Sequence, residues 1–102
     1  MPLRAGGLLV DPRRRSVTRD GEPVELTTLE FDLLAALVRE PGMVFTRQQL
    51  LDAVWGVDFF GDDHVLDVHV ANLRRKLGDE PSHARYVETV RGVGFRFPED
   101  HR

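Results

Sequence analysis

The stretch HVLDVHVANLRRKL, residues 64–77, determines the fold of this 102-residue chain. Its apolar residues recur at the spacing of one buried face of an α-helix: Leu66, Val70, Leu73 and Leu77. At about 100° per residue, the opposite face carries His64, Val68, Ala71, Asn72 and Arg75. The stretch therefore predicts an amphipathic helix. The centre of its exposed face has a valine, an amide and an arginine, and it has no carboxylate.

That exposed face has the chemistry of a reader of the DNA major groove. There, arginine pairs with guanine, asparagine pairs with adenine, and an apolar side chain meets the methyl group of thymine. The alternative is an amphipathic helix whose outer face meets only solvent. The segments around the helix decide between the two interpretations.

The composition indicates one soluble globular domain. No apolar run approaches the roughly 18 residues needed to span a bilayer, and no signal peptide is visible, so we expect a cytoplasmic protein with no membrane partner. The chain has no cysteine, which excludes disulfides and thiolate metal sites. The net charge of −3 disfavours contacts with phosphate, but residues 64–97 hold six basic and four acidic residues and are locally basic.

Before residue 27 the sequence predicts a small antiparallel sheet. Three short β-prone runs, at 8–10, 16–18 and 24–26, are separated by the turn signals Asp11-Pro12 and Asp20-Gly21. Three consecutive arginines follow the first turn signal. This arginine run, Arg13 to Arg15, either contacts DNA or a partner, or forms a solvated edge that blocks aggregation.

Two capping signatures mark two helices that precede residue 64. Residues 27–30 and 46–49 have the T-x-x-E or T-x-x-Q form of a capping box. The first helix is expected to end at Pro41-Gly42, and a short extended link at 44–45 leads to the second, which Gly56 stops.

The second helix carries two candidate contact residues. Arg47 lies in its first turn, where free backbone N–H groups and the positive dipole end suit a phosphate; the alternative for Arg47 is plain exposure to solvent. Trp55 is expected in the core, although its indole N–H can donate to a phosphate at the rim.

Residues 57–63, VDFFGDD, connect the second helix to the third. Their three aspartates would repel phosphate, so this loop suits DNA poorly. Either Phe59 and Phe60 fill the core, or the loop presents an acidic and aromatic patch to a protein. Asp62 or Asp63 is expected to cap the third helix.

Two β-prone runs, 85–90 and 95–97, flank a turn with two glycines and predict a C-terminal hairpin. Because Phe95 and Phe97 alternate with Arg96, one face of the hairpin should be buried. Arg91 stands at the tip beside glycines that permit close approach. It is either simply exposed or inserts into a minor groove next to the third helix.

In this order, the elements form the pattern of a winged helix-turn-helix. The sequence resembles the OmpR/PhoB-type effector domain of bacterial two-component response regulators. The segments that carry the resemblance are LTTLEF at 26–31, FTRQQLL at 45–51, VWG at 54–56, DVHV at 67–70, LRRKL at 73–77 and TVRGVGFRF at 89–97. The resemblance implies an α+β domain over residues 1–102, with an N-terminal antiparallel sheet, a three-helix core and a hairpin wing.

The resemblance also implies sequence-specific binding of double-stranded DNA for transcriptional regulation in a phosphorelay. The third helix would enter the major groove and the wing the adjacent minor groove, with bases read by Val68, Asn72, Arg75 and Arg91. The DNA backbone would be contacted by Arg47, Trp55, His64, His69, Ala71, Arg74 and Thr89. The loop that engages RNA polymerase would be Val57, Asp58, Phe59, Phe60, Gly61, Asp62 and Asp63.

The chain departs from the family at the reading face. Many members carry arginines where this chain has Ala71 and Asn72, and an arginine is common at His64, whose phosphate contact would be weak near neutral pH. Such regulators normally carry an N-terminal receiver domain, so we expect this chain to be the isolated effector part of one. The domain should be monomeric alone and pair head to tail on DNA, about one helical turn apart.

The sequence predicts no enzyme, no cofactor and no metal site. It contains no cysteine nucleophile, G-x-S-x-G elbow or phosphate loop. His64 and His69 lie roughly 140° apart around a helix, too far to share a metal ion. Asp63, His64 and Asp67 would hold at most a stray cation. The remaining alternative is a winged helix that binds protein instead of DNA. The acidic total favours it, whereas the exposed helix face and the Arg91 wing oppose it.

The expected fold has a defined core. Eight side chains should be buried: Leu34, Leu37, Leu50, Val54, Leu66, Val70, Leu73 and Phe97. Val68 and Asn72 should lie outside it.

Overall fold

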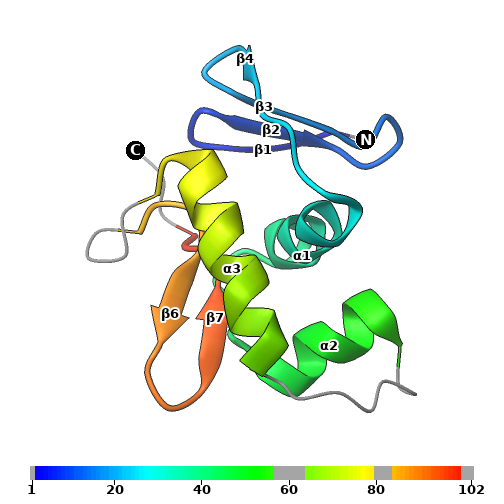
Figure 1. The fold of residues 1–102 in the computed structure, drawn as a ribbon. Helices are drawn as coiled ribbons and strands as arrows, with labels where there is room; N and C mark the ends of the chain where they lie inside the picture. The colour runs from blue at the N-terminus through cyan, green and yellow to red at the C-terminus, as the bar shows by residue number, and fades with distance from the viewer. Residues whose placement is uncertain (1, 57–63, 80–83, 100–102) are drawn as a thin grey trace.

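A computed structural model describes residues 2–56, 64–79 and 84–99. Figure 1 shows an antiparallel sheet followed by three helices and a hairpin, and this confirms the predicted α+β architecture. The first sheet has the order β1 (Leu3–Ala5), β2 (Leu8–Asp11), β3 (Ser16–Arg19) and β4 (Glu22–Pro23). The helices are α1 (Thr28–Arg39), α2 (Arg47–Trp55) and α3 (His64–Leu77). The second sheet has the order β5 (Phe45–Thr46), β7 (Gly94–Arg96) and β6 (Glu88–Val90).

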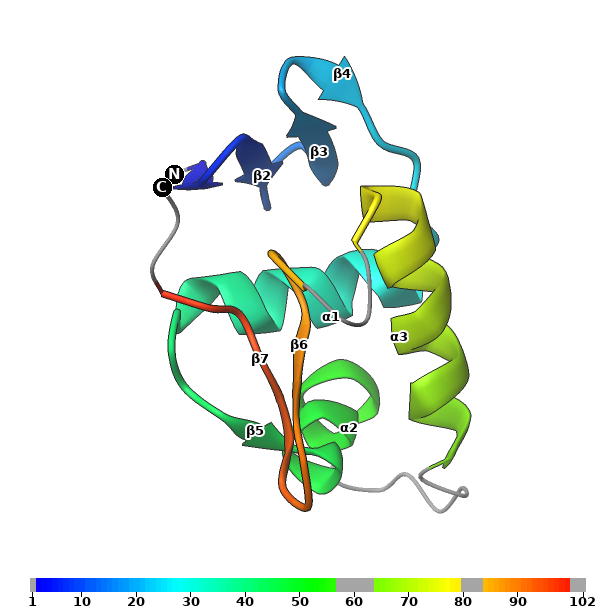
Figure 2. The same ribbon diagram turned by 90° about the vertical axis from the view of Figure 1, so that its left-hand side faces the viewer.

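The helices and sheets are arranged in layers around α1. Figure 2 shows the four-stranded sheet on one side of α1, with α2 and the β6–β7 hairpin on the other and α3 along the flank. Seven of the eight expected core residues are buried, whereas Val54 is only half-buried because α2 buries just Leu50 and Leu51. None of the helices in the described ranges is long and apolar enough to cross a bilayer.

Both predicted capping boxes are present. The Thr27 hydroxyl accepts a hydrogen bond from the Glu30 N–H at 3.2 Å, and the Glu30 carboxylate accepts one from the Thr27 N–H at 3.0 Å. Thr46 and Gln49 repeat this arrangement at 3.0 and 2.8 Å. These side chains satisfy backbone groups that the first helical turn leaves unpaired, so they define where α1 and α2 begin.

The N-terminal sheet differs from the prediction at both edges. Strand β1 was not predicted, because three residues with an exposed Arg4 give a weak signal; it pairs with β2. The strand predicted at 24–26 is wrong. After the Val24 N–H donates to the Val17 carbonyl at 2.9 Å, the chain leaves the sheet to begin α1.

The hairpin has the predicted faces but a shorter first strand. Phe95 and Phe97 are buried, and Arg96 lies half-buried on the other face, where it pairs with Glu88. Residues 85–87 are not part of β6, since their N–H groups donate to the Asp79 carboxylate instead of to a strand.

An ion pair joins α1 to the last turns of α3. The Glu30 carboxylate, only 2% exposed, accepts a hydrogen bond from Lys76 Nζ at 2.7 Å. Burial raises the pKa of Glu30, but the hydrogen bonds from Lys76 and Thr27 and the Lys76 charge outweigh it, so the pKa lies below its ordinary value. The pair therefore stabilises the fold above the ordinary glutamate pKa, and this contribution is lost as the pH falls through the lowered value.

We expect Lys76→Met to reduce the free energy of unfolding by about 3 kcal/mol at pH 7, because it leaves a buried carboxylate without its partner. In the variant the pKa of Glu30 rises, since burial is then less opposed, and protonation relieves the loss. The difference between variant and parent should therefore shrink as the pH falls toward 4.5, the ordinary glutamate value. Urea unfolding from pH 7 to pH 4 measures it, and a pH-independent difference would contradict the assignment.

A close approach of backbones at Gly94 yields a second test. A Cβ at this position would lie 1.9 Å from the Phe45 carbonyl oxygen, so Gly94→Ala should push β5 from β7 and cost more than about 2 kcal/mol. Gly92→Ala is the matched control, because a Cβ there meets nothing within 4 Å. It should cost only the strain of its positive φ, about 1 kcal/mol. Equal losses in urea unfolding would show that the β5–β7 contact does not constrain Gly94.

Candidate nucleic-acid interface

Helix α3 divides its side chains as the sequence predicted. Leu66, Val70, Leu73 and Leu77 are buried. On the opposite side His64, Val68, Ala71 and Arg75 are exposed, Val68 by 58%, and Asn72 is half-buried. Val65, which the sequence analysis did not single out, is 37% exposed beside them. The spacing of the apolar residues was enough to predict which side of α3 is buried.

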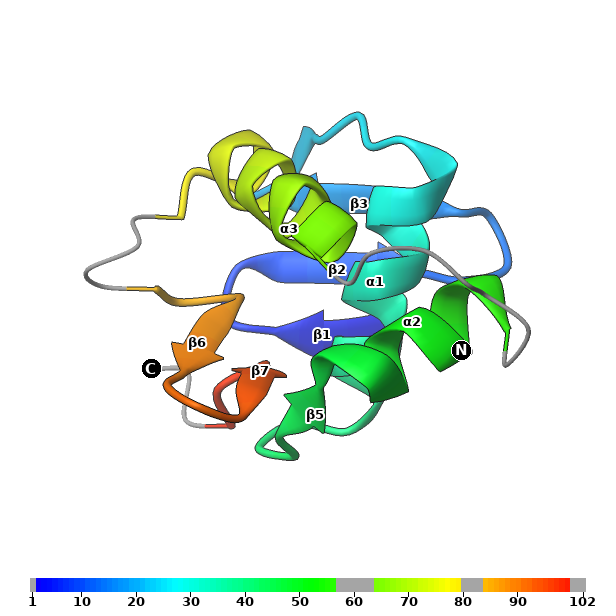
Figure 3. The same ribbon diagram turned by 60° about the horizontal axis from the view of Figure 1, so that its bottom comes forward.

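The tip of the hairpin is also exposed. Arg91 lies in the turn between β6 and β7, together with Gly92 at φ 76° and Val93, which is 47% exposed. Figure 3 shows α3, α2 and the hairpin around one face of the molecule, with the four-stranded sheet behind them. We call the exposed side of α3 together with the hairpin tip the α3–wing face.

Arg47, at the start of α2, is held by an acidic residue of α3. Its Nε donates to Asp67 Oδ1 at 2.9 Å and its Nη2 to Asp67 Oδ2 at 3.5 Å, while its guanidinium carbon lies 5.2 Å from the centre of the Phe95 ring. Arg47 is therefore half-buried and paired within the protein, and both alternatives for it, contact with a phosphate and exposure to solvent, stay predictions. Asp67 Oδ2 also lies 3.7 Å from His64 Nδ1. Asp67 thus connects the start of α2 to the first turn of α3.

Arg74 turns from α3 toward the hairpin. Its Nε donates to the Val87 carbonyl oxygen at 2.9 Å, its Nη2 donates to the Thr89 hydroxyl, and its guanidinium carbon lies 5.7 Å from the centre of the Phe95 ring. Burial lowers the pKa of Arg74, and the charges of Asp79 and Asp67 act in the opposite direction. Two of its donors are therefore committed within the protein, while Thr89 itself is exposed.

These residues surround a pocket of about 190 Å³ between α2, α3 and the hairpin. Its lining consists of Arg47, Asp67, Val70, Arg74, Thr89 and Phe95. The two guanidinium groups that line it are engaged by groups of the protein, Arg47 by the Asp67 carboxylate and Arg74 by Val87 and Thr89. Sequence reasoning missed Asp67 and Phe95 as partners of these arginines, because residues that far apart in the chain leave no local pattern.

Trp55 and His69 lie together at the edge of the core. Their ring centres are 6.0 Å apart, and both side chains are half-buried. Trp55 packs against the core, as expected. The loop at 57–63 and the predicted caps within it lie outside the described residues. In the described part of the chain, no group of three His, Cys, Asp or Glu side chains could hold a metal ion.

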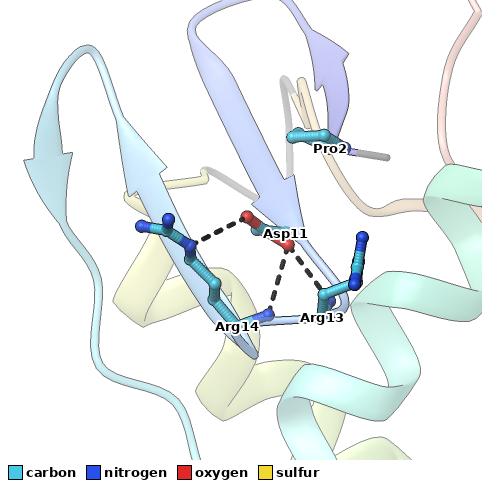
Figure 4. A pocket seen from close by; sticks show the side chains of 4 residues that line it. All are labelled: Pro2, Asp11, Arg13 and Arg14. Atoms are coloured by element: carbon cyan, nitrogen blue, oxygen red, sulfur yellow. Dashed lines mark hydrogen bonds and ion pairs between the residues drawn. The ribbon is translucent and has the colours of Figure 1, made fainter.

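The arginine run lies at the turn between β2 and β3, on the four-stranded sheet. Arg13 and Arg14 are exposed and line a pocket of about 670 Å³ with Asp11, whose carboxylate accepts from their backbone N–H groups at 3.0 and 3.2 Å (Figure 4). Arg15 instead pairs with Asp32 of α1 at 2.9 Å. The last member of the run therefore fastens the turn to α1.

Comparison with known proteins gives consistent matches. The family described as "Transcriptional regulatory protein, C terminal" matches residues 21–97. The chain is 47% identical over 94 residues to the sensory transduction protein RegX3 of Mycolicibacterium smegmatis, and this match covers 92% of the chain and 41% of that protein. The chain thus spans about two fifths of the length of this curated relative.

Solved structures extend the likeness to three dimensions. The DNA-binding domain of RstA from Klebsiella pneumoniae, solved in complex with the RstA box, superposes with a TM-score of 0.88 at 35% identity and covers 97% of this chain and 98% of that one. The response regulator DrrB of Thermotoga maritima, an OmpR/PhoB homolog, gives a TM-score of 0.86 at 30% identity over 95% of this chain and 44% of that one.

Proposed function

Because this chain belongs to the family of C-terminal domains of transcriptional regulatory proteins, the OmpR/PhoB-type DNA-binding effector domains, we propose that α3 enters the major groove of its DNA target and the β6–β7 wing the adjacent minor groove. The main support for this proposal is the composition of the exposed side of α3. Its valine, amide and arginine are turned outward by the burial of the opposite side, and none of the five residues predicted on that side is a carboxylate.

In the major groove, three residues of α3 would read bases. Val68 and Asn72 are one helical turn apart, about 6 Å along the axis, which spans roughly two base-pair steps. Val68 would contact a thymine methyl group, and the Asn72 amide would bond both N6 and N7 of an adenine. Arg75, three residues further along the same side, would donate to O6 and N7 of a guanine.

In the minor groove, Arg91 would read shape and charge. The groove offers a degenerate pattern that mainly separates A·T from G·C pairs, and its negative potential deepens where it narrows. Arg91 is exposed in the turn of the wing, and its neighbour Gly92 adds no side chain there. We therefore expect Arg91 to favour an A·T-rich flank.

Contacts to the DNA backbone would surround these readers. Arg47 has five N–H donors, of which Asp67 engages two, so the others remain to donate to a phosphate in a fixed orientation. Thr89 would donate its hydroxyl proton to a phosphate while its oxygen accepts from Arg74. The remaining candidates are Trp55, His64, His69, Ala71 and Arg74.

The wider partners follow from the family. We propose that two such domains occupy DNA head to tail, about one helical turn apart, and that the full-length regulator joins each to a receiver domain in the cytoplasm. The matched region is only 41% of RegX3, so this relative is longer than the domain, and this supports the proposed receiver domain. We further propose residues 57–63 as the contact with RNA polymerase, because their aspartates suit protein better than phosphate.

Substitutions of a residue that faces the major groove and of one that faces the minor groove should have different effects. Asn72→Ala should weaken binding to the best site by about 1–3 kcal/mol and relax the preference at one position. Arg91→Ala should weaken binding most on sites with an A·T-rich flank and leave the preference within the major groove unchanged. Selection from random duplexes followed by affinity measurements on both flanks tests this. If the two variants lose the same affinity on both flanks and show the same base preferences within the site, the proposed division between the grooves is contradicted.

The phosphate contact at Arg47 has a separate signature. Arg47→Ala should weaken binding to all sequences alike and reduce the slope of log affinity against log salt by about one unit. Arg39→Ala, at the exposed end of α1, removes the same charge elsewhere and should leave the slope unchanged. A winged helix that binds only protein would show no affinity for duplex DNA at any salt concentration.

A further inference from the structure

The last turn of α3 places one buried carboxylate in a fixed position. The Gly78 N–H donates to the Arg75 carbonyl at 3.2 Å, and the Asp79 N–H donates to the Arg74 carbonyl at 2.8 Å. With Gly78 at φ 73°, these two bonds form a Schellman motif, which closes the helix rigidly. The backbone of Asp79 is therefore fixed to α3.

The Asp79 side chain holds the segment that leads into the wing. One carboxylate oxygen accepts from the Arg85 N–H at 2.8 Å and the Tyr86 N–H at 3.2 Å. The other accepts from the Tyr86 N–H at 3.0 Å and the Val87 N–H at 2.8 Å. Three consecutive residues immediately before β6 are thus attached through one carboxylate to the end of α3.

Arg74 holds the same segment from the side of the helix. It donates to the Val87 carbonyl oxygen, so both backbone polar groups of Val87 are bound by side chains from the end of α3. Val87 is fully buried. On the other strand of the wing, β7 is attached by its two-residue pairing with β5 and by the burial of Phe95 in the core, so Asp79 and Arg74 provide the polar attachment on the β6 side.

We propose that Asp79 is a positioning residue for minor-groove reading: it sets the wing relative to α3, so that Arg91 enters its groove while Asn72 and Arg75 read theirs. This inference rests on the proposed function. From Val87 to the tip, the three residues of β6 extend about 10 Å. A tilt of about 10° at Val87 would then move the tip by roughly 2 Å, a third of the roughly 6 Å width of the minor groove.

The test compares Asp79→Asn with a control that makes the same change of charge. The asparagine replaces an accepting oxygen with an amide donor that faces backbone N–H groups, so the attachment is weakened at nearly constant volume. Glu88→Gln is the control, since Glu88 pairs with Arg96 within the hairpin and does not contact α3 in this attachment. Affinities are measured for duplexes that carry an A·T-rich or a G·C-rich flank at the wing, and for duplexes with the base pair under Asn72 changed.

We expect Asp79→Asn to reduce the ratio of affinities between the two flanks by about fivefold or more, approaching the ratio of Arg91→Ala. The discrimination at the Asn72 position should stay within about twofold of the parent, and Glu88→Gln should preserve both. The double variant Asp79→Asn/Arg91→Ala should show no further loss of flank preference, because both changes act through one contact.

Several results would overturn the inference. If Asp79→Asn retains the parental flank ratio, or weakens discrimination at the flank and at the Asn72 position equally, Asp79 does not act on the wing selectively. If Asp79→Asn fails to fold, Asp79→Glu takes its place, since it keeps the charge but moves the carboxylate by one methylene from the N–H groups of residues 85–87; an unchanged flank ratio there overturns the inference as well. If Arg91→Ala itself leaves the flank ratio unchanged, the proposed minor-groove role fails and the inference with it.

Discussion

The burial of four side chains along one side of α3 is the constraint on which the interface depends. Leu66, Val70, Leu73 and Leu77 are each excluded from water, and each contributes about 1.5–3 kcal/mol by burial. Breaking the buried Lys76–Glu30 pair costs about 3 kcal/mol, and exposed ion pairs contribute at most about 1 kcal/mol each. The four apolar side chains together outweigh these terms, so the apolar contacts decide how α3 is rotated. Since a helix is rigid, burying one side turns His64, Val68 and Arg75 outward with no further requirement.

Charged side chains then fix the ends of α3. Asp67 binds Arg47 at its start, while Lys76 binds Glu30 and Asp79 binds the base of the wing at its end. These contacts also explain how an acidic chain presents a face suited to phosphate. The carboxylate of Asp67 in α3 and that of Asp79 in the Schellman motif bind groups of the protein, whereas Arg75 and Arg91 remain exposed. The distribution of charge therefore matters more than the net value of −3.

The sequence predicted what is encoded by local pattern. The apolar spacing predicted α3 with its bounds at 64–77, and two capping boxes predicted the starts of α1 and α2. What failed depends on contacts that strand propensity does not encode. Residues 85–87 have strand propensity, but the Asp79 carboxylate takes their N–H groups; residues 24–26 leave the sheet to reach α1. The partnership of Arg47 with Asp67 across twenty positions has no signature in a single sequence.

The joint use of α3 and the wing is tested most directly by titrating the isotope-labelled domain with a selected duplex and following its NMR signals. The largest changes should fall on the Val68 methyl groups, the Asn72 side-chain amide and the Arg91 guanidinium, with small changes in the four-stranded sheet. If the changes instead cluster on β1 to β4 and spare α3 and the wing, the DNA-binding surface lies elsewhere and the account is wrong.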